Sequence, residues 1–91
     1  MVNIFCYPTF FKAIGNPVRQ KIVNILHSKK EVKVKDLVDE LKLSQSTVSH
    51  HLAVLKNAKI VKAREEGVEA YYSLCCDTIT KCCSHLEKFF K

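Results

Sequence analysis

Residues 43 to 74 read LSQSTVSHHLAVLKNAKIVKAREEGVEAYYSL, and this stretch decides the fold of the chain. Its first half repeats apolar side chains at i, i+4 and i+7, the spacing of one helix face; these residues are Val48, Leu52 and Leu55. Ser44 stands just before the run, where its hydroxyl can cap the free backbone N–H groups of a first turn. The pattern therefore predicts a short helix that begins after Ser44 and ends near Asn57.

Small polar side chains dominate the opposite face of this helix. At about 100° per residue, the residues on that face are Ser46, Ser49, His50, Ala53 and Asn57. None of them is long or acidic, so the floor of a DNA major groove can approach the helix closely. Gln45 and Thr47 lie in the first turn, the part of a recognition helix that usually meets base edges. The alternative is an ordinary surface helix with small residues outside.

Two short β-prone runs follow the helix and predict a β-hairpin. They cover residues 60 to 64 and 69 to 74, and the Glu-Glu-Gly segment between them supplies a glycine for the positive φ of a tight turn. Lys62 and Arg64 make the first strand basic, whereas the two glutamates oppose phosphate contact at the tip itself. A recognition helix followed by a basic hairpin predicts a winged helix-turn-helix that binds DNA, with Lys62 and Arg64 among the contacts.

The rest of the chain completes this fold with four more helices. Helices are expected over residues 4–14 and 34–42. Between them, Asn16 followed by Pro17 marks the start of another helix that runs to about Ser28. Asp77 can cap a last helix that runs to about Phe90. The expected order is α-α-α-α-β-β-α, one mainly helical domain over residues 1–91. The side chains expected to face inward from the first three helices are Ile4, Phe11, Ile14, Val18, Ile22, Ile25, Leu26, Leu37, Val38 and Leu41.

Composition agrees with a small DNA-binding module. Ninety-one residues form only a small core, which dimerisation would extend, and the net charge of +6 indicates a polyanionic partner. A merely lysine-rich protein is the alternative that charge alone leaves open. The apolar N-terminus is short and lacks a basic region, so neither a signal peptide nor a membrane span is expected, and the cytoplasm is the expected location. With two glycines and no phosphate-binding loop, the chain is not expected to be an enzyme.

Nearly the whole chain resembles the ArsR/SmtB family of metal-responsive repressors. The matching pieces are FKAIGNPVRQKIVNIL, VKDLVDELKLSQSTVSHHLAVLKNAKIV and REEGVEAYYSL. The resemblance implies a homodimer that represses its own operon at a palindromic operator in double-stranded DNA and that an inducer releases. Carried over by position, the resemblance implies contacts to bases and phosphates from Gln45, Ser46, Ser49 and His50. His51 lies beside the apolar stripe and is expected to pack inside.

Two inducer sites of that family are missing from this chain. One uses cysteines in a motif like ELCVCDL before the recognition helix, where this chain has Lys33 and Lys35. The other is a zinc site on the last helix that needs Asp and His ligands, and the aligned positions hold Cys76, Thr78 and Phe89. An inducer must therefore bind elsewhere.

Four cysteines at the start of the last helix and within it form the candidate inducer site: Cys75, Cys76, Cys82 and Cys83. Some arsenic-responsive members of the family carry a vicinal pair and a third cysteine six residues later, a spacing that Cys75, Cys76 and Cys82 fit. The resemblance thus implies arsenic(III) or antimony(III), or another thiophilic metal ion, as inducer. Positions 75 and 82 are about 10.5 Å apart on a regular helix. One ion can join Cys75 and Cys82 only if the Cys75-Cys76 pair lies before the helix and folds back toward it. Otherwise some of the ligands must come from the partner subunit.

Other roles for the cysteines stay open. Cys82 and Cys83 also fall on an apolar stripe that predicts a dimer face, so packing is the alternative to ligation for Cys83. Cys6, in the first helix, is expected to be structural. A second hypothesis is the same repressor switched by oxidation or persulfidation without a metal. A third is a winged-helix module for protein or RNA contacts, or a thiol-rich metal carrier.

Overall fold

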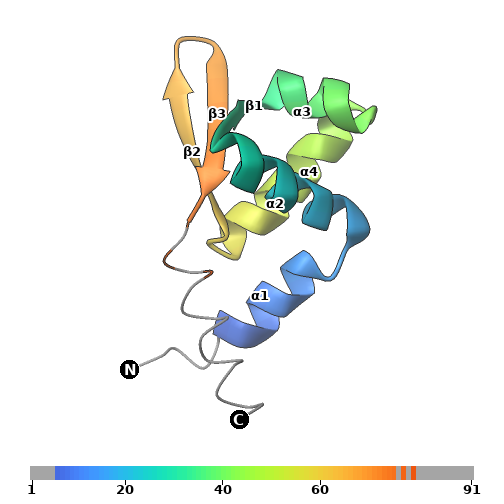
Figure 1. Ribbon diagram of the computed structural model, residues 1–91, viewed down its shortest axis with the longest axis vertical. Helices are drawn as coiled ribbons and strands as arrows, with labels where there is room; N and C mark the ends of the chain where they lie inside the picture. Colours follow the sequence, from blue (N-terminus) through green and yellow to red (C-terminus); the bar gives the residue numbers. More distant parts are fainter. Residues whose placement is uncertain (1–5, 76, 78, 80–91) are drawn as a thin grey trace.

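The computed structural model of the protein describes residues 6–75, 77 and 79. Its helices and strands, labelled in Figure 1, are α1 (Cys6–Ile14), α2 (Pro17–Lys29), β1 (Glu31–Lys33), α3 (Val34–Leu41), α4 (Gln45–Asn57), β2 (Val61–Glu66) and β3 (Glu69–Leu74). The expected winged helix-turn-helix is confirmed, with one strand added. The last helix, expected from Asp77 to Phe90, lies outside the described residues except at positions 77 and 79, which have helical backbone.

Two polar side chains start the helices as the sequence predicts. Asn16 Oδ1 accepts hydrogen bonds from the backbone N–H groups of Val18 (2.8 Å) and Arg19 (3.2 Å) at the start of α2. Ser44 Oγ accepts a hydrogen bond from the backbone N–H of Thr47 (3.2 Å) at the start of α4. Each cap satisfies N–H groups that have no partner within the helix, and so fixes where the helix begins.

Strand β1 is the element that the sequence did not predict. It pairs antiparallel with β3, so the sheet has the order β1-β3-β2, with Lys33 opposite Tyr71 and Tyr71 opposite Arg64. Three residues are too few to show a strand pattern. Their pairing depends on residues some forty positions further along the chain, which no local pattern reports.

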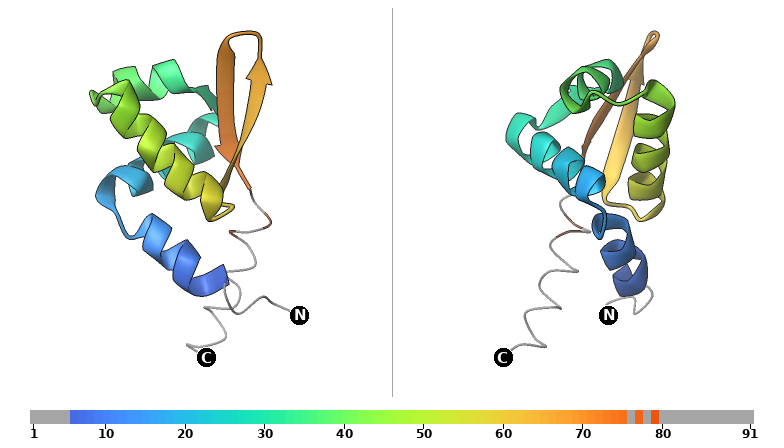
Figure 2. Two further views of the ribbon diagram at one scale, coloured as in Figure 1. Left: turned by 180° about the vertical axis from the view of Figure 1, so that it is seen from behind. Right: turned by 90° about the vertical axis from the view of Figure 1, so that its right-hand side faces the viewer.

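The hairpin turns at two residues. Glu66 pairs with Glu69, which leaves Gly67 and Val68 as the loop, and Gly67 has the positive φ of 64° that its missing side chain permits. Val68 at the tip is fully exposed. Figure 2 shows the hairpin on one side of the helices, with α1 at the end of the molecule away from the hairpin tip.

A single apolar cluster joins the helices to one face of the sheet. Its buried members are Phe10, Ala13, Ile22, Leu26, Val32, Leu37, Val48, Leu52, Leu55, Ala58, Ile60 and Val61. The expected inward stripes of α2, α3 and α4 are therefore confirmed, although Val18, Ile25, Val38 and Leu41 are only partly buried at its edge. Within the described residues, no helix is long and apolar enough to cross a membrane.

In α1 the expected side chains lie at the edge of the core, and two neighbouring residues are the fully buried ones. Phe10 and Ala13 are buried, whereas Phe11 and Ile14 are only half-buried; Ile4 lies outside the described residues. Phe10 belongs to the core cluster, and its ring stands perpendicular to the Phe11 ring at a centroid distance of 5.1 Å. The half-buried side chains of α1 are thus left partly open to solvent.

Candidate nucleic-acid interface and cysteine site

The recognition helix α4 is oriented as the sequence predicts. Val48, Leu52 and Leu55 are at most 1% exposed and face the core. The candidate DNA contacts on this helix are all exposed: Gln45, Ser46, Thr47, Ser49 and His50. Ala53 and Asn57 are exposed as well. The helix therefore presents a surface of small polar side chains, the shape that a major groove accepts.

Hydroxyl groups at the start of α4 already form a small network. Ser44 Oγ donates to Thr47 Oγ1 at 2.8 Å and lies 3.2 Å from Ser46 Oγ. Thr47 is thus tied to the helix cap through both its backbone and its side chain. Ser49 and His50, about one turn further, are exposed as well.

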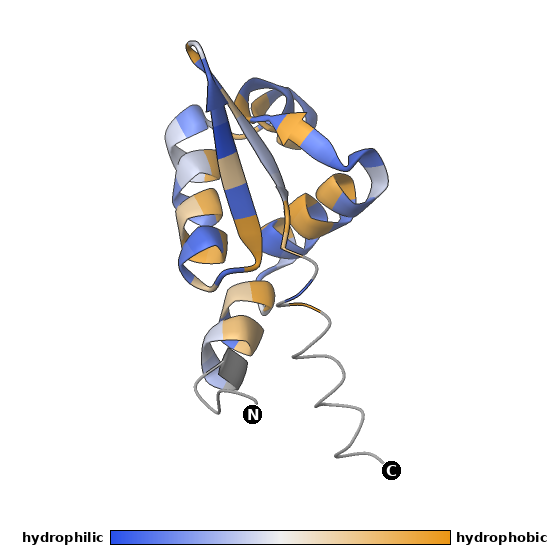
Figure 3. Cartoon of the chain, turned by 90° about the vertical axis from the view of Figure 1, so that its left-hand side faces the viewer, coloured by the Kyte–Doolittle hydropathy of each residue, from blue (hydrophilic) through white to orange (hydrophobic). Residues whose placement is uncertain are grey.

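The wing carries its basic residues on the outer face of the sheet. Over the first four residues of β2, apolar side chains alternate with exposed charged ones, and the hydropathy colours of Figure 3 show this alternation. Lys62 and Arg64 lie on the exposed side, while Val61 and Ala63 face the helices. Both predicted contacts of the wing therefore lie on one face of the molecule.

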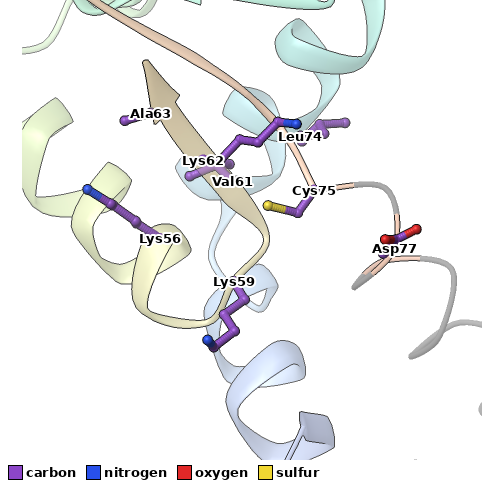
Figure 4. Close-up of a pocket in the computed structure, with 8 residues that line it drawn as sticks. All are labelled: Lys56, Lys59, Val61, Lys62, Ala63, Leu74, Cys75 and Asp77. Atoms are coloured by element: carbon purple, nitrogen blue, oxygen red, sulfur yellow. The ribbon is translucent and has the colours of Figure 1, made fainter. Parts of the chain in front are cut away.

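Lys62 and Arg64 have different surroundings. Lys62 lines a hollow of about 660 Å³ with Lys56, Lys59 and Cys75 (Figure 4), and among the described residues it forms no ion pair. Arg64, by contrast, bonds to carboxylates on two strands. Its guanidinium donates to Glu31 at 2.9 and 3.2 Å and to Glu66, and it lies 4.6 Å from the ring centroid of Tyr71.

His51 is partly buried beside the apolar stripe of α4, in agreement with its expected packing. Its ring is half-buried, and its Nδ1 lies 3.2 Å from an Nη atom of Arg19. The same arginine donates from Nε to the backbone oxygen of Ala13 (2.5 Å), at the end of α1. Arg19 thus connects α1 to α4, and this link was not predicted, because 32 residues separate Arg19 from His51.

This environment lowers the pKa of His51 from its ordinary value of 6.5. Burial is the main cause, and the positive charge of Arg19 and the neighbouring His50 also oppose protonation. Nδ1 can accept a hydrogen bond from Arg19 only when the ring is neutral.

The lowered pKa predicts a pH dependence of folding stability. Above about pH 6.5 the histidine is neutral in both the folded and the unfolded chain, and its stabilising contribution is complete. Below pH 6.5 the unfolded chain binds the proton first, so stability is lost until the pH reaches the lower folded-state pKa. Between pH 7.5 and pH 5.5, the free energy of unfolding measured with urea should fall less for His51→Gln than for the wild type. The exposed His27→Gln variant is the control, and equal losses in all three proteins would contradict the assignment.

The cysteines are only partly described. Cys75 follows β3, is half-buried and free, and its sulfur points toward Val61 and Lys62 (Figure 4). Cys76, Cys82 and Cys83 lie outside the described residues, as does the side chain of Cys6. Within the described part of the chain, no three metal-binding side chains come together. The predicted four-cysteine site thus stays a prediction.

A backbone connection links Cys75 to the recognition helix. The N–H of Cys75 donates to the oxygen of Ile60 (2.8 Å), and the N–H of Ile60 donates to the oxygen of Leu55 in α4 (2.9 Å). Ile60 is fully buried, so this connector is fixed by packing as well. The start of the last helix is therefore two hydrogen bonds from the end of α4.

Fold and exposed helix face together define a DNA-binding transcriptional regulator of the winged-helix class. Residues 16–63 match the family of bacterial regulatory proteins of the arsR type, which covers more than half of the chain. The protein belongs to this ArsR/SmtB family of DNA-binding transcriptional repressors, and two of its relatives are named as repressors. The family consists of transcriptional regulators and not of enzymes.

Three comparisons illustrate the relationship. A helix-turn-helix transcriptional regulator of Methanocaldococcus jannaschii is 45% identical over 69 residues, which cover 76% of this chain and 78% of that protein. A homologue of the cadmium resistance regulator CadC of Staphylococcus aureus is 44% identical over 70% of this chain, although the match covers only 53% of that longer relative. The crystal structure of a possible transcriptional regulator for arsenical resistance superposes with a TM-score of 0.79 at 28% identity, over 89% of this chain and 83% of the other.

Proposed function

We propose that residues 1–91 act as a single-domain repressor subunit that pairs into a homodimer and holds a palindromic operator until a thiophilic inducer binds its last helix. The observation that carries this proposal is the path of hydrogen bonds from Cys75 through Ile60 to Leu55. A ligand that moves Cys75 also moves the end of the helix that reads DNA. The cytoplasm, where thiols remain reduced, is the compartment in which such a switch operates.

The proposed DNA contacts come from the exposed face of α4 and from the wing. Gln45, Ser46, Thr47, Ser49 and His50 would meet bases and phosphates in the major groove, and Lys62 would meet the backbone beside it. Two such helices, related by a two-fold axis, read half-sites about one helical turn, ~34 Å, apart. This spacing explains why the operator is expected to be palindromic.

Dimerisation is proposed through α1 and the last helix. Phe11 and Ile14 of α1 are partly open to solvent in the single chain, as is Ile79 at the start of the last helix. A second subunit would cover these apolar side chains, and a chain of this length gains much from the additional buried surface.

The inducer is proposed to be arsenic(III) or antimony(III), bound by Cys75, Cys76 and Cys82 with Cys83 as a further ligand. Thiolates favour thiophilic ions of this kind, and relatives of this chain are named for cadmium and arsenic resistance. Cys75 is half-buried and free, so its thiol is available for ligation. Release requires that the ion bind the DNA-free arrangement more tightly than the DNA-bound one. The alternative is that the same cysteines respond to oxidation or persulfide without a metal.

Two kinds of substitution test the DNA interface. Ser46→Ala and His50→Ala should each weaken binding to the operator by about 1–3 kcal/mol, the value of a good base contact, with little effect on random duplexes. Lys62→Gln should weaken binding to every duplex alike and reduce the salt dependence by about one phosphate contact. Fluorescence anisotropy titrations at several salt concentrations measure both effects. If His50→Ala binds the operator as tightly as the wild type, the proposed face of α4 is wrong.

A further inference from the structure

Arg64 is the wing residue that the sequence assigns to DNA, yet its guanidinium is already bound within the protein. Arg64, Tyr71 and Lys33 stand side by side on neighbouring strands in the order β2, β3, β1. The guanidinium crosses the Tyr71 ring and reaches Glu31 on the far strand, where two hydrogen bonds of 2.9 and 3.2 Å join the two groups. Glu66, two residues along on β2, binds the same guanidinium from the other side. Arg64 therefore lies in a cage of two carboxylates.

The charges of this cage depend on one another. The hydrogen bond from Arg64 is the main cause of the lowered pKa of Glu31, and bonds from Glu31 and Glu66 raise the pKa of Arg64. All three side chains remain between 39% and 68% exposed, so water competes for each bond and the pairs add little to folding stability. Another anion can therefore replace these carboxylates at Arg64 at a small cost in free energy.

Carboxylate and phosphate present similar pairs of oxygens to an arginine. The planar guanidinium donates two parallel hydrogen bonds to either group, as it does to Glu31 here. Any DNA phosphate that approaches Arg64 must therefore displace a carboxylate that offers the same geometry. Lys62, on the same face of β2, forms no ion pair among the described residues, although its charge also acts on Glu31.

We infer that Glu31 and Glu66 act as an internal substitute for DNA phosphate that withholds Arg64 from the DNA backbone. Their effect is to limit affinity for DNA of any sequence, so that discrimination rests on α4. Glu31 is thus a residue that determines specificity without touching DNA. The inference rests on the proposed DNA binding and deepens it, because it explains why an arginine on a wing would be held back.

The test compares two carboxylates that carry the same charge. Glu31→Gln removes the carboxylate that accepts two hydrogen bonds from Arg64 and leaves Glu66 in place. Glu65→Gln removes an exposed neighbouring charge that strand alternation places on the opposite face. Arg64→Gln is made alone and together with Glu31→Gln. Binding of the full chain to a random-sequence duplex and to the selected operator is measured across salt concentrations. Retention on immobilised heparin, a polyanion without bases, is measured in parallel.

The inference expects Glu31→Gln to tighten random-duplex binding by about fivefold per protomer at 0.15 M salt, the effect of one released phosphate contact, and to steepen the salt dependence by about 0.9 per protomer. Glu65→Gln should give a smaller change. The gain should depend on Arg64, so the double variant should bind no more tightly than Arg64→Gln alone. Heparin retention should follow the same order.

Equal behaviour of Glu31→Gln and Glu65→Gln would overturn the inference, because charge alone would then explain the change. Weaker binding by Glu31→Gln would also overturn it, since the cage would then position Arg64 for contact. The wild type could show no preference for any duplex sequence while heparin retention follows the expected order. The inference about Arg64 would then be supported, and the proposed operator recognition would be wrong.

Discussion

Leu52→Asp is expected to unfold the protein. Leu52 is 1% exposed beneath α4, where the core holds Val48, Leu55 and Ile60 around it. An unpaired carboxylate in such a place costs several kcal/mol, and the apolar contacts of the leucine are lost as well. The free energy of unfolding of a small domain is only about 5–15 kcal/mol. This single change therefore removes most or all of the folding stability. Circular dichroism and thermal denaturation measure the loss.

The neighbouring residue provides the matched control. Ala53 is exposed on the opposite face of α4, so Ala53→Asp introduces the same charge without entering the core. This variant should melt close to the wild type and yet bind DNA poorly, since the carboxylate would face the phosphates. A folded Leu52→Asp protein that still binds DNA would show that α4 is rotated relative to the structure.

The elements that were predictable from sequence are those whose determinants are local. The cap at Ser44, the apolar stripe of α4 and the glycine at the hairpin tip all act within a few residues, so the sequence alone predicts each of them. The exposed face of α4 followed directly from the buried one. The homodimer and the inducer rest on the likeness to a known family and stay predictions.

The features that were missed depend on residues far apart in the chain. Strand β1 exists because residues 31–33 pair with β3, and the cage of Arg64 exists because that pairing brings Glu31 within reach. The link between Arg19 and His51 likewise spans 32 residues. In α1, the burial of Phe10 and Ala13 was missed, although the predicted Phe11 and Ile14 do pack against the edge of the core.

The largest functional effect is expected from the cysteine pair. The double variant Cys75→Ser/Cys76→Ser should bind the operator like the wild type and should no longer release it with arsenite or antimonite. In the wild type, a coupling of about 1–3 kcal/mol lowers operator affinity roughly 5- to 150-fold when the inducer binds. The double variant loses this change because its hydroxyl groups replace the thiolates that thiophilic ions require.

Cys6→Ser is the control for this experiment, since Cys6 begins α1 and is assigned a structural role. It should release operator as the wild type does. Mass spectrometry of each protein after treatment with arsenite, and separately with a persulfide donor, identifies which adduct forms and on which cysteines.

One titration tests the central claim most directly. The wild type is first bound to a fluorescent palindromic duplex, obtained by selection from a random-sequence pool, and arsenite, antimonite or a persulfide donor is then added while anisotropy is followed. We expect the arsenic and antimony species to return the anisotropy to that of free DNA, with two protomers leaving each duplex. Continued binding in the presence of both ions, with release by the persulfide donor alone, would contradict the metalloid switch and leave a repressor controlled by thiol oxidation.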